Sequence, residues 1–436
     1  MKILFLERKL RIDKIGFLYL SSILKNAGHE VDMIQDEVDS ADKYLSENPV
    51  DFIMYSVMTG EHLWFLERNE QLKKKFGFHS VMGGPHFTFF PEQGLVNQYV
   101  DYVVQGPGEN VILDIVNGHY AEYDQKLIIG TMPDVNSLPH PDRTILYKYD
   151  EFGKARMKRF IAARYCLYSC KYCFNHLYKR LYKNEKDKFK QRISPDKMID
   201  EILDVKKRYG LEVVYFNDDD FPGDSDWLKE FCEKYKEKVH LPYCGSMRAS
   251  SVNRETVKMM ADSGCSFMNI ALESANPETQ KFLRRGFITN EQVEEACSAC
   301  REYGIKVRLQ NMIGLPVKDP LQDALDTLTY NIKINPTDSW SAVFQPFPKT
   351  DLWQYCLDEG LITRETQAVN FYEGTQLKIV NAEKINRLYK WWYFAVKYQL
   401  PMELIKILIE LPLTKEQDRY MQELRWNIAK KELYNM

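Results

Sequence analysis

The sequence has no long uninterrupted hydrophobic run and very little net charge. Its longest apolar run near the C-terminus, LIKILIELPL at 404–413, is short and is interrupted by Lys406 and Glu410. It therefore cannot span a bilayer. The formal net charge of −3 and the isoelectric point near 6.3 give no overall attraction to nucleic acid or anionic lipid. These absences predict neither a membrane span nor a nucleic-acid partner.

The sequence also shows no secretion signal and no cysteine spacing typical of a disulfide framework. The chain opens MKILFLERK, which is typical of a strand followed at once by charges, with no signal-peptide h-region or cleavage site. Its nine cysteines, an odd number, are scattered through a long chain, and this does not suggest paired disulfides. We therefore expect a cytoplasmic protein, in which a tight group of cysteines is a candidate metal site.

The first part of the chain alternates short apolar runs with helical patterns. The helix expected over 14–27 ends at Gly28, a common C-terminal signal. Strands separated by helices predict a parallel, doubly wound (Rossmann-like) α/β sheet, which binds ligands beyond the carboxyl ends of its strands. The expected strands are 2–6, 30–34, 51–57, 80–84 and 101–105, and the loops at their carboxyl ends are 56–61, 83–92 and 105–110.

A second strand–helix series follows a proline-containing stretch. Six repeats predict an open, partial (β/α)6 barrel, whose chemistry belongs at the carboxyl ends of the strands. The stretch 386–401 is rich in aromatic residues, and at helical spacing it indicates a packed core. The expected strands are 160–165, 212–217, 243–248, 267–273, 306–314 and 340–345, with helices at 196–209 and 290–303. The predicted domains are 1–130, a linker at 131–152, the barrel at 153–350 and a mainly helical C-terminal domain at 351–436.

Three cysteines stand inside the stretch YCLYSCKYCFN at 165–175, directly after the first expected barrel strand. Thiolates bind zinc or the iron of iron–sulfur clusters. A structural zinc site needs four ligands, and no second pair stands in a loop nearby. Cys297 and Cys300 lie in the middle of an expected helix, where their spacing indicates one buried face. Three ligands, Cys166, Cys170 and Cys173, would leave one iron of a cubane cluster open for another molecule.

The spacing CxxxCxxC, with the aromatic Tyr172 before the last cysteine, resembles the radical S-adenosylmethionine (radical SAM) superfamily. Further segments match that family in order along roughly 155–352. They are FNDDDF at 216–221, SMRAS at 246–250, IALES at 270–274, MIGLP at 312–316 and PFPKT at 346–350. The resemblance implies a [4Fe–4S] cluster on the three cysteines and a bound S-adenosylmethionine (SAM).

The same resemblance assigns roles to residues at the strand ends. Asp218 or Asp219 would accept hydrogen bonds from the amino group of SAM, and Arg248 would contact its carboxylate. Glu273 with Ser274 would bind the ribose, and the backbone around Ile313 and Gly314 would contact the adenine. The alternative for Asp220, Ser274 and Asn311 is a strand-end residue that caps the following helix.

The N-terminal domain resembles the cobalamin-binding domain that is fused to one large radical SAM class. The matching segments are GFLYLSSILKNAGHEVDMI at 16–34, SVMTG at 56–60, GGPHFTFFPE at 83–92 and GPGEN at 106–110. Gly83 and Gly84 would let the backbone approach a bulky ring, and Glu109 is kept in a GPGE turn. Hydrogen bonds to the corrin amides or the nucleotide tail would come from Ser56, Thr59, His86 and Thr88. No DxHxxG motif is present to supply a histidine to cobalt. The alternatives are that His86 ligates cobalt, or that the domain is degenerate and binds no corrin.

Together these resemblances imply a class B C-methyltransferase that uses two SAM molecules per turnover on an unactivated sp3 carbon. One SAM would supply the methyl group through methylcobalamin and the other a 5′-deoxyadenosyl radical, with an electron from a donor such as ferredoxin or flavodoxin. The substrate would be an amino-acid side chain of a peptide or protein, such as glutamine or arginine of methyl-coenzyme M reductase, or a small molecule. Candidate catalytic or substrate-contacting side chains are Tyr168, Tyr215 and Gln345.

Two other functions remain open from the sequence. One is a cobalamin-dependent radical rearrangement, cyclisation or ring contraction, in which no methyl group is transferred. The other is a protein that binds cobalamin or a cluster as a sensor and catalyses nothing.

Overall fold

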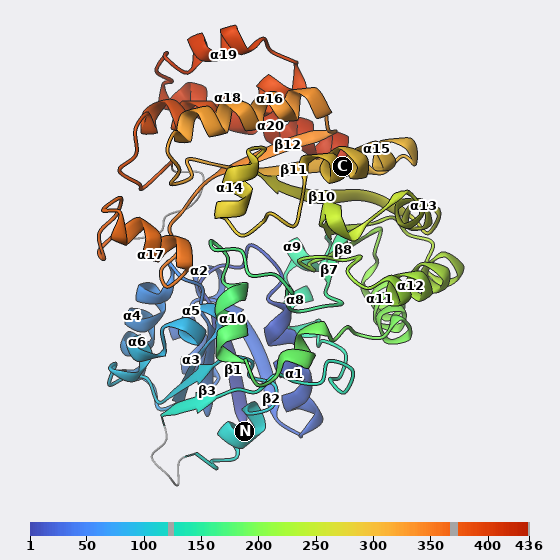
Figure 1. Cartoon of the computed structure of the whole chain (residues 1–436). Helices are drawn as coiled ribbons and strands as arrows, with labels where there is room; N and C mark the ends of the chain where they lie inside the picture. The colour runs from blue at the N-terminus through green and yellow to red at the C-terminus, as the bar shows by residue number, and fades with distance from the viewer. Residues whose placement is uncertain (121–125, 367–373, 435–436) are drawn as a thin grey trace. The chain divides into compact units, whose positions relative to one another are not determined.

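The computed structural model describes residues 1–120, 126–366 and 374–434 (Figure 1). The described chain forms two compact units. The first comprises 1–160, 182–193 and 200–211, and the second comprises 161–181, 194–199 and 212–436. Two six-stranded sheets organise the fold, as the α/β pattern of the sequence predicts.

The first sheet has the strand order β2-β1-β3-β4-β5-β6, and all its pairs are parallel. Its strands are β1 (Lys2–Glu7), β2 (Glu30–Gln35), β3 (Phe52–Ser56), β4 (His79–Gly83), β5 (Tyr102–Gln105) and β6 (Leu127–Ile129). The order reverses between β1 and β3, and this switch point is where such sheets bind ligands. The sequence predicts five of these strands and misses β6, because three residues are too few to show periodicity.

Helices pack on both faces of the first sheet. Leu4 and Leu6 share a core with Phe65 of α4, whereas the intervening Phe5 stacks on Phe17 of α1 with ring centroids 4.3 Å apart. Alternate residues of a strand face opposite sides, so this packing confirms the doubly wound arrangement. The helices of this part are α1 (Ile15–Asn26), α2 (Asp36–Asp39), α3 (Ala41–Glu47), α4 (His62–Lys73), α5 (Gly84–Phe89), α6 (Pro91–Leu95), α7 (Ile112–Val116), α8 (Thr144–Tyr147) and α9 (Asp150–Gly153).

The second sheet has the order β12-β11-β10-β9-β8-β7. Its strands are β7 (Met157–Phe160), β8 (Val213–Phe216), β9 (Tyr243–Met247), β10 (Cys265–Glu273), β11 (Lys306–Ile313) and β12 (Asp338–Val343). The predicted strand at 160–165 is wrong in position. The strand ends at Phe160 because the next backbone amides, of Ala162 and Ala163, bind the carboxylate of Asp218 at 2.9 and 2.7 Å.

Helices alternate with these strands and continue to the C-terminus. They are α10 (Asn175–Leu181), α11 (Pro195–Tyr209), α12 (Ser225–Lys238), α13 (Arg254–Asp262), α14 (Pro277–Phe282), α15 (Asn290–Glu302), α16 (Pro320–Ile334), α17 (Asp351–Asp358), α18 (Ala382–Lys397), α19 (Met402–Leu408) and α20 (Lys415–Tyr434), with 3-10 turns η2 (Lys186–Lys190) and η3 (Ala249–Ser251). Among the described residues, no helix combines the length and apolar character that a membrane crossing needs.

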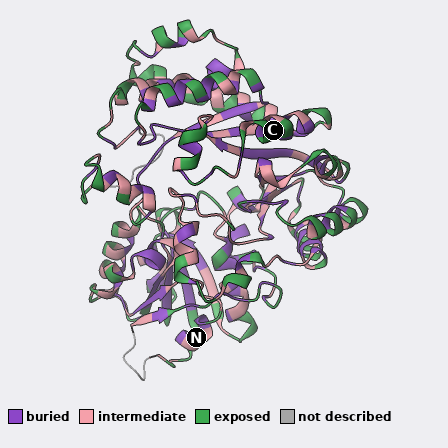
Figure 2. Cartoon of the chain, in the orientation of Figure 1, coloured by how far each residue is buried: buried purple, intermediate pink, exposed green. Residues whose placement is uncertain are grey.

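The C-terminal aromatic stretch forms core, as predicted. Helix α18 lies beside β12 and α16, and Figure 2 shows one side of it buried. Trp392 is fully buried there and donates from its indole nitrogen to Ser339 Oγ at 2.8 Å. Cys297 and Cys300 are likewise buried on α15, which confirms their structural interpretation.

Candidate active site

The three clustered cysteines lie in a loop between β7 and α10, which is held by backbone and side-chain contacts. The backbone N–H of Lys171 donates to Leu283 at 3.1 Å, and its carbonyl accepts from Leu352 at 3.0 Å. His176 of α10 is buried and contacts the carbonyl of Cys170 at 3.1 Å and Asp351 of α17 at 3.3 Å. The loop is therefore fixed on both sides by elements of the second unit.

Two donors point at the cysteine sulfurs. Arg285 Nη1 lies 3.8 Å from Cys170 Sγ, and Asn175 Nδ2 lies 3.5 Å from Cys173 Sγ. Such donors are typical partners of sulfur in iron–sulfur sites. Burial raises the pKa of Cys166, and it raises that of Cys173 to about 12. The thiolate forms would therefore need a strongly bound cation.

The donor set of the cysteine loop can be compared with that of an iron–sulfur cluster. Such clusters are held by cysteine thiolates, whose sulfurs often accept hydrogen bonds. The chemistry of the donor set, three thiols with N–H donors on two of them, fits such a cluster.

The guanidinium of Arg248, which follows β9, has the environment of a group that binds an anion. Its backbone N–H and its Nη2 both contact Asp220, which also accepts from Ser251 Oγ at 2.9 Å. The guanidinium stacks on the ring of Tyr168, with Cζ 3.6 Å from the ring centroid. Its Nε and Nη1 are buried and have no hydrogen-bond partner among the described residues. The unpaired Nη1 of this fixed guanidinium fits a carboxylate ligand, whereas Nε lies on the edge shared with Nη2, which contacts Asp220.

Asp219 is the exposed member of the three consecutive aspartates. It accepts from Asn175 Nδ2 at 3.0 Å, the same amide that faces Cys173. Asp218, by contrast, is buried and binds the Ala162 and Ala163 amides with its two oxygens. Of the two predicted partners for an amino group, the structure favours Asp219.

Glu273 ends β10 in a left-handed conformation, with φ of 69°. The register of β10 on β11 shifts between Ala271 and Glu273, which marks a bulge. Its carboxylate accepts from the phenol of Tyr172 at 2.9 Å. Non-glycine residues rarely hold such a backbone, and strained residues cluster at ligand sites. The hydrogen bond ties the predicted ribose ligand to the cysteine loop.

Three other predicted residues have internal roles in the structure. Ser274 is fully buried, donates to Asp323 at 3.0 Å and accepts from the Asn276 amide at 3.1 Å, while Asn276 is the residue that caps α14. The Ile313 side chain is in the core, and its carbonyl accepts from Phe344 at 2.9 Å. Gly314 has a φ of 71°, a backbone conformation that favours glycine. Because glycine has no side chain, Gly314 could contact an adenine only through its backbone.

The predicted catalytic side chains fall in different environments. Tyr168 lies between Arg248 and Phe287, whose ring centroid is 4.0 Å away. The hydroxyl of Tyr215 on β8 accepts from Asn269 Nδ2 at 3.2 Å. Gln345, after β12, is buried and donates to the carbonyl of Gly374 at 2.8 Å. Tyr168 thus contacts another predicted site residue, Arg248.

In the first unit, an ion pair that the sequence analysis does not single out lies at the switch point of the sheet. Lys14 Nζ lies 3.3 Å from Glu7 Oε1 at the end of β1 and donates to the Ser56 carbonyl at the end of β3 at 3.0 Å. Burial raises the pKa of Glu7 to about 7, and the contact with Lys14 acts against this shift. Neither residue belongs to a motif that could have identified it.

Gly83 and Gly84 differ in whether the surrounding structure leaves room for a side chain. Gly84 has φ of 87°, and an added Cβ would lie 2.5 Å from the Val57 nitrogen and 3.0 Å from Ser56 Oγ. No other residue fits there. At Gly83 an added Cβ would meet nothing closer than 3.8 Å. The fold itself does not demand a glycine at 83, and this fits a backbone kept bare for a large ligand.

The remaining predicted corrin contacts are partly used within the unit. His86 is buried, contacts Thr59 Oγ1 at 3.3 Å and Gln93 Oε1 at 3.1 Å through its two ring nitrogens, and stacks on His62. Thr88 joins two loops, donating to Gly84 O at 2.9 Å and accepting from the Gly106 amide at 3.2 Å. Glu109 is half-buried. The structure thus gives His86 and Thr88 supporting roles.

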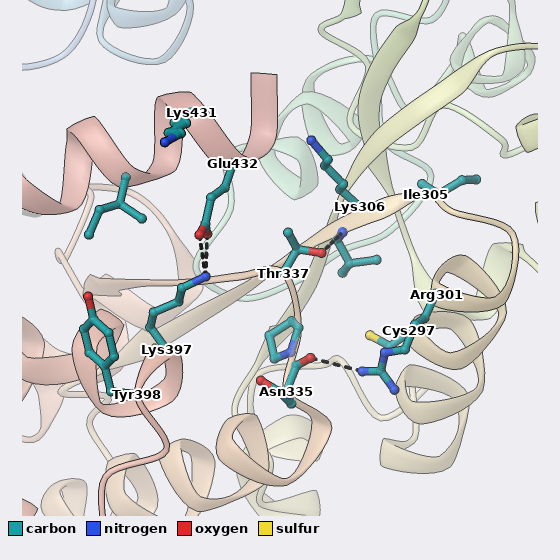
Figure 3. Close-up of a pocket in the computed structure, with 13 residues that line it drawn as sticks. Cys297, Arg301, Ile305, Lys306, Asn335, Thr337, Lys397, Tyr398, Lys431 and Glu432 are labelled. Carbon is teal, nitrogen blue, oxygen red and sulfur yellow. Dashed lines mark hydrogen bonds and ion pairs between the residues drawn. The ribbon is translucent and has the colours of Figure 1, made fainter. Parts of the chain in front are cut away.

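A cavity of about 980 Å³ lies at the amino-terminal ends of β11 and β12 (Figure 3). Lys397 donates to both oxygens of Glu432, at 2.7 and 2.6 Å, and Arg301 donates to the carbonyls of Ile334 and Asn335 at 2.6 and 3.0 Å. These contacts join the ends of α15, α16, α18 and α20. The cavity is at the end of the sheet opposite the cysteine loop, and we assign its charges to packing.

Family models match two parts of the chain. The B12 binding domain matches residues 1–116, and the Radical SAM superfamily matches residues 160–328. An uncharacterized methyltransferase of Pyrococcus horikoshii is 25% identical over 360 residues, which cover 76% of this chain and 74% of the relative. The bacteriochlorophyllide d C-8(2)-methyltransferase of Chlorobaculum tepidum is 23% identical over 358 residues, covering 77% and 74%.

A solved structure shares the fold across most of the chain. It is that of the radical SAM methyltransferase TsrM from Kitasatospora setae with cobalamin and a [4Fe–4S] cluster bound. The TM-score is 0.67 at 15% sequence identity, covering 84% of this chain and 76% of that one. The likeness establishes the order of a doubly wound domain followed by a partial barrel.

Proposed function

Because the chain belongs to the cobalamin-binding radical SAM enzymes, with a B12 binding domain ahead of a radical SAM domain, we propose that it methylates an unactivated sp3 carbon. When bound, the [4Fe–4S] cluster supplies the electron that cleaves SAM, and cobalamin carries a methyl group. The family thus provides cluster, SAM and cobalamin as cofactors, and the residues of this chain bind and orient them.

The observation that carries the proposal is the fixed guanidinium of Arg248. Its buried Nε and Nη1 lack partners within the described chain, while Asp220 and Tyr168 hold the group in place. We assign Nη1 to the SAM carboxylate and Asp219 to the SAM amino group. Glu273 would accept hydrogen bonds from the ribose. This set orients SAM beside the loop of Cys166, Cys170 and Cys173.

In the first unit, we assign the corrin to the carboxyl edge of the sheet, above Gly83 and the switch point between β1 and β3. Ser56 ends β3, and Thr59 and Glu109 lie on the loops of that edge. His86 has both ring nitrogens in internal contacts. We therefore propose that His86 supports the α5 loop and is not a cobalt ligand.

The names of the two curated relatives and of TsrM support methyl transfer as the reaction. We propose two SAM molecules per turnover, one as methyl donor and one as radical source. An amino-acid side chain of a peptide or protein is the proposed substrate class, and a low-potential electron donor is the proposed partner. A rearrangement or cyclisation would leave the substrate without an added carbon.

The reconstituted protein tests this proposal with SAM and dithionite. We expect both S-adenosylhomocysteine, from methyl transfer to cobalamin, and 5′-deoxyadenosine, from reductive cleavage. Cys166→Ala should abolish 5′-deoxyadenosine. The matched control is Cys297→Ala on α15, a buried cysteine outside the loop, which should keep it. Cleavage that survives in Cys166→Ala would refute the cluster assignment, and cleavage without any S-adenosylhomocysteine would refute the methyl donor role.

A further inference from the structure

Arg285 is placed by the end of helix α14. The helix ends in a Schellman motif, in which the N–H of Arg285 donates to Gln280 at 2.7 Å and that of Arg284 donates to Lys281 at 3.0 Å. Arg284 takes the left-handed position, with φ of 57°. This turn separates two neighbouring arginines. Arg285 is buried, whereas Arg284 is about half exposed and pairs with Asp351 at 2.6 Å.

The guanidinium of Arg285 reaches the cysteine loop. Its Nη1 lies 3.8 Å from Cys170 Sγ and 3.1 Å from the phenol oxygen of Tyr172, and its Nη2 donates to the Ala271 carbonyl at 2.6 Å. The phenol in turn donates to Glu273 at 2.9 Å. Within the described chain, no carboxylate oxygen lies in direct contact with this guanidinium. A positive charge is therefore buried beside one cluster ligand, with Glu273 as a carboxylate on the far side of the Tyr172 phenol.

We propose that Arg285 raises the reduction potential of the cluster by acting through Cys170. The reductant gives one electron, and the cluster with its thiolates gains one negative charge. A cation in a region of low dielectric constant attracts this added charge, and a hydrogen bond to the sulfur strengthens with it. Both effects favour the reduced form. Arg285 thus makes reduction, the step that must precede SAM cleavage, easier.

This inference depends on the cluster but not on methyl transfer, so its test needs neither substrate nor turnover. The measurement is an EPR-monitored redox titration of the reconstituted protein, with iron and sulfide content determined for every sample. The variants are Arg285→Met, which removes the charge, and Arg285→Lys, which keeps it. Arg284→Gln is the matched control, because its charge is exposed and already paired with Asp351.

For Arg285→Met we expect at least a tenfold lower ratio of reduced to oxidised cluster at the wild-type midpoint. This corresponds to a shift of about 59 mV to more negative potential for a one-electron couple. Arg285→Lys and Arg284→Gln should change the ratio less than twofold to threefold. A cluster in Arg285→Met that keeps the wild-type potential would overturn the proposal. The same negative shift in Arg284→Gln would also overturn it.

A second variant covers the case in which Arg285→Met holds no cluster. Tyr172→Phe leaves the guanidinium in place and removes the phenol oxygen that shares Nη1 with Cys170. Arg285 Nη1 can then donate to Cys170 Sγ alone, so the reduction potential of the cluster should stay equal or rise. A tenfold fall in the reduced fraction for Tyr172→Phe would contradict a role of this N–H in the potential. If the wild-type protein itself binds no iron and sulfide, the cofactor assignment fails instead.

Discussion

At the scale of single residues, Arg248 stands out because part of its hydrogen-bonding capacity is buried and unused. Each buried donor without a partner costs about 1–3 kcal/mol. A SAM carboxylate would satisfy Nη1. The contact with Asp220 and the stacking on Tyr168 fix the group before the ligand arrives. Less entropy is then lost on binding.

Arg248→Gln should therefore weaken SAM binding by about 1.5–3 kcal/mol, roughly 10- to 100-fold in Kd. Calorimetric titration of the cluster-loaded protein with SAM measures this. The control is Arg254→Gln on α13, whose exposed arginine pairs with Glu295 and should leave Kd unchanged. Equal affinities for the wild type and Arg248→Gln would remove Arg248 from the site.

Ser274 and Glu273 are neighbours in sequence, yet they should respond in opposite ways. Ser274→Ala breaks a buried link to Asp323 and the Asn276 amide, so thermal stability should fall by about 1–2 kcal/mol with unchanged SAM affinity. Glu273→Gln keeps an acceptor for Tyr172 but loses the charge. It should weaken SAM binding with little change in thermal midpoint. A loss of SAM affinity in Ser274→Ala would restore its predicted ribose role.

The sequence indicates which residue types gather at the strand ends, but not which of them remain available to a ligand. Asp218, Asp219 and Ser274 belong to matching motifs, and only their hydrogen-bond partners separate the exposed aspartate from the two internal residues. Arg285 has no motif. Its position results from the left-handed turn at Arg284, which a non-glycine residue does not signal in sequence.

At the scale of elements, the cysteine loop depends on a carboxylate that arrives from another strand. Asp218 follows β8 and replaces the strand partner that Ala162 and Ala163 would otherwise need. The loop is thereby held open at its first residues. This arrangement links the end of β8 to the position of Cys166.

Asp218→Ala should loosen the loop, because two buried amides lose their acceptor at a cost of about 1–3 kcal/mol each. We expect the reconstituted variant to lose iron to a chelator several-fold faster than the wild type. Asp218→Asn, which keeps one acceptor oxygen, should be intermediate. Cluster loss at the wild-type rate in Asp218→Ala would mean that the amides do not hold the loop.

The two glycines after β4 provide a matched pair. Gly84→Ala requires a strained backbone and a Cβ 2.5 Å from the Val57 nitrogen, so it should destabilise the apoprotein by more than about 2 kcal/mol. Gly83→Ala should leave apoprotein stability unchanged and weaken cobalamin binding. Thermal unfolding and spectrophotometric cobalamin titration measure the two effects. Unimpaired cobalamin binding by Gly83→Ala would place the corrin elsewhere.

Most elements are predictable because buried strands carry continuous apolar runs and amphipathic helices show clear periodicity. Strands β1, β3 and β10 lie close to their predicted ranges. Strand β7 is displaced, because its end is set by a distant carboxylate and not by local pattern. Strand β6 has three residues, and its pairing with β5 is visible only in three dimensions.

At the scale of the whole molecule, the chain joins a domain for a methyl carrier to a domain for radical generation. The division is not a simple cut in the sequence, since residues 182–193 and 200–211 pack with the first unit. The proposed methylation of an unactivated carbon needs both cofactors to act on one substrate.

The most direct test adds the holoprotein, dithionite and SAM with a deuterated methyl group to an extract of cells that lack the gene. Mass spectrometry of peptides and metabolites then shows what is modified. The account predicts a product in which a hydrogen on carbon is replaced by the deuterated methyl group, together with 5′-deoxyadenosine. A modified product with no deuterium and an unchanged or lower mass would contradict methyl transfer and favour a radical rearrangement or cyclisation.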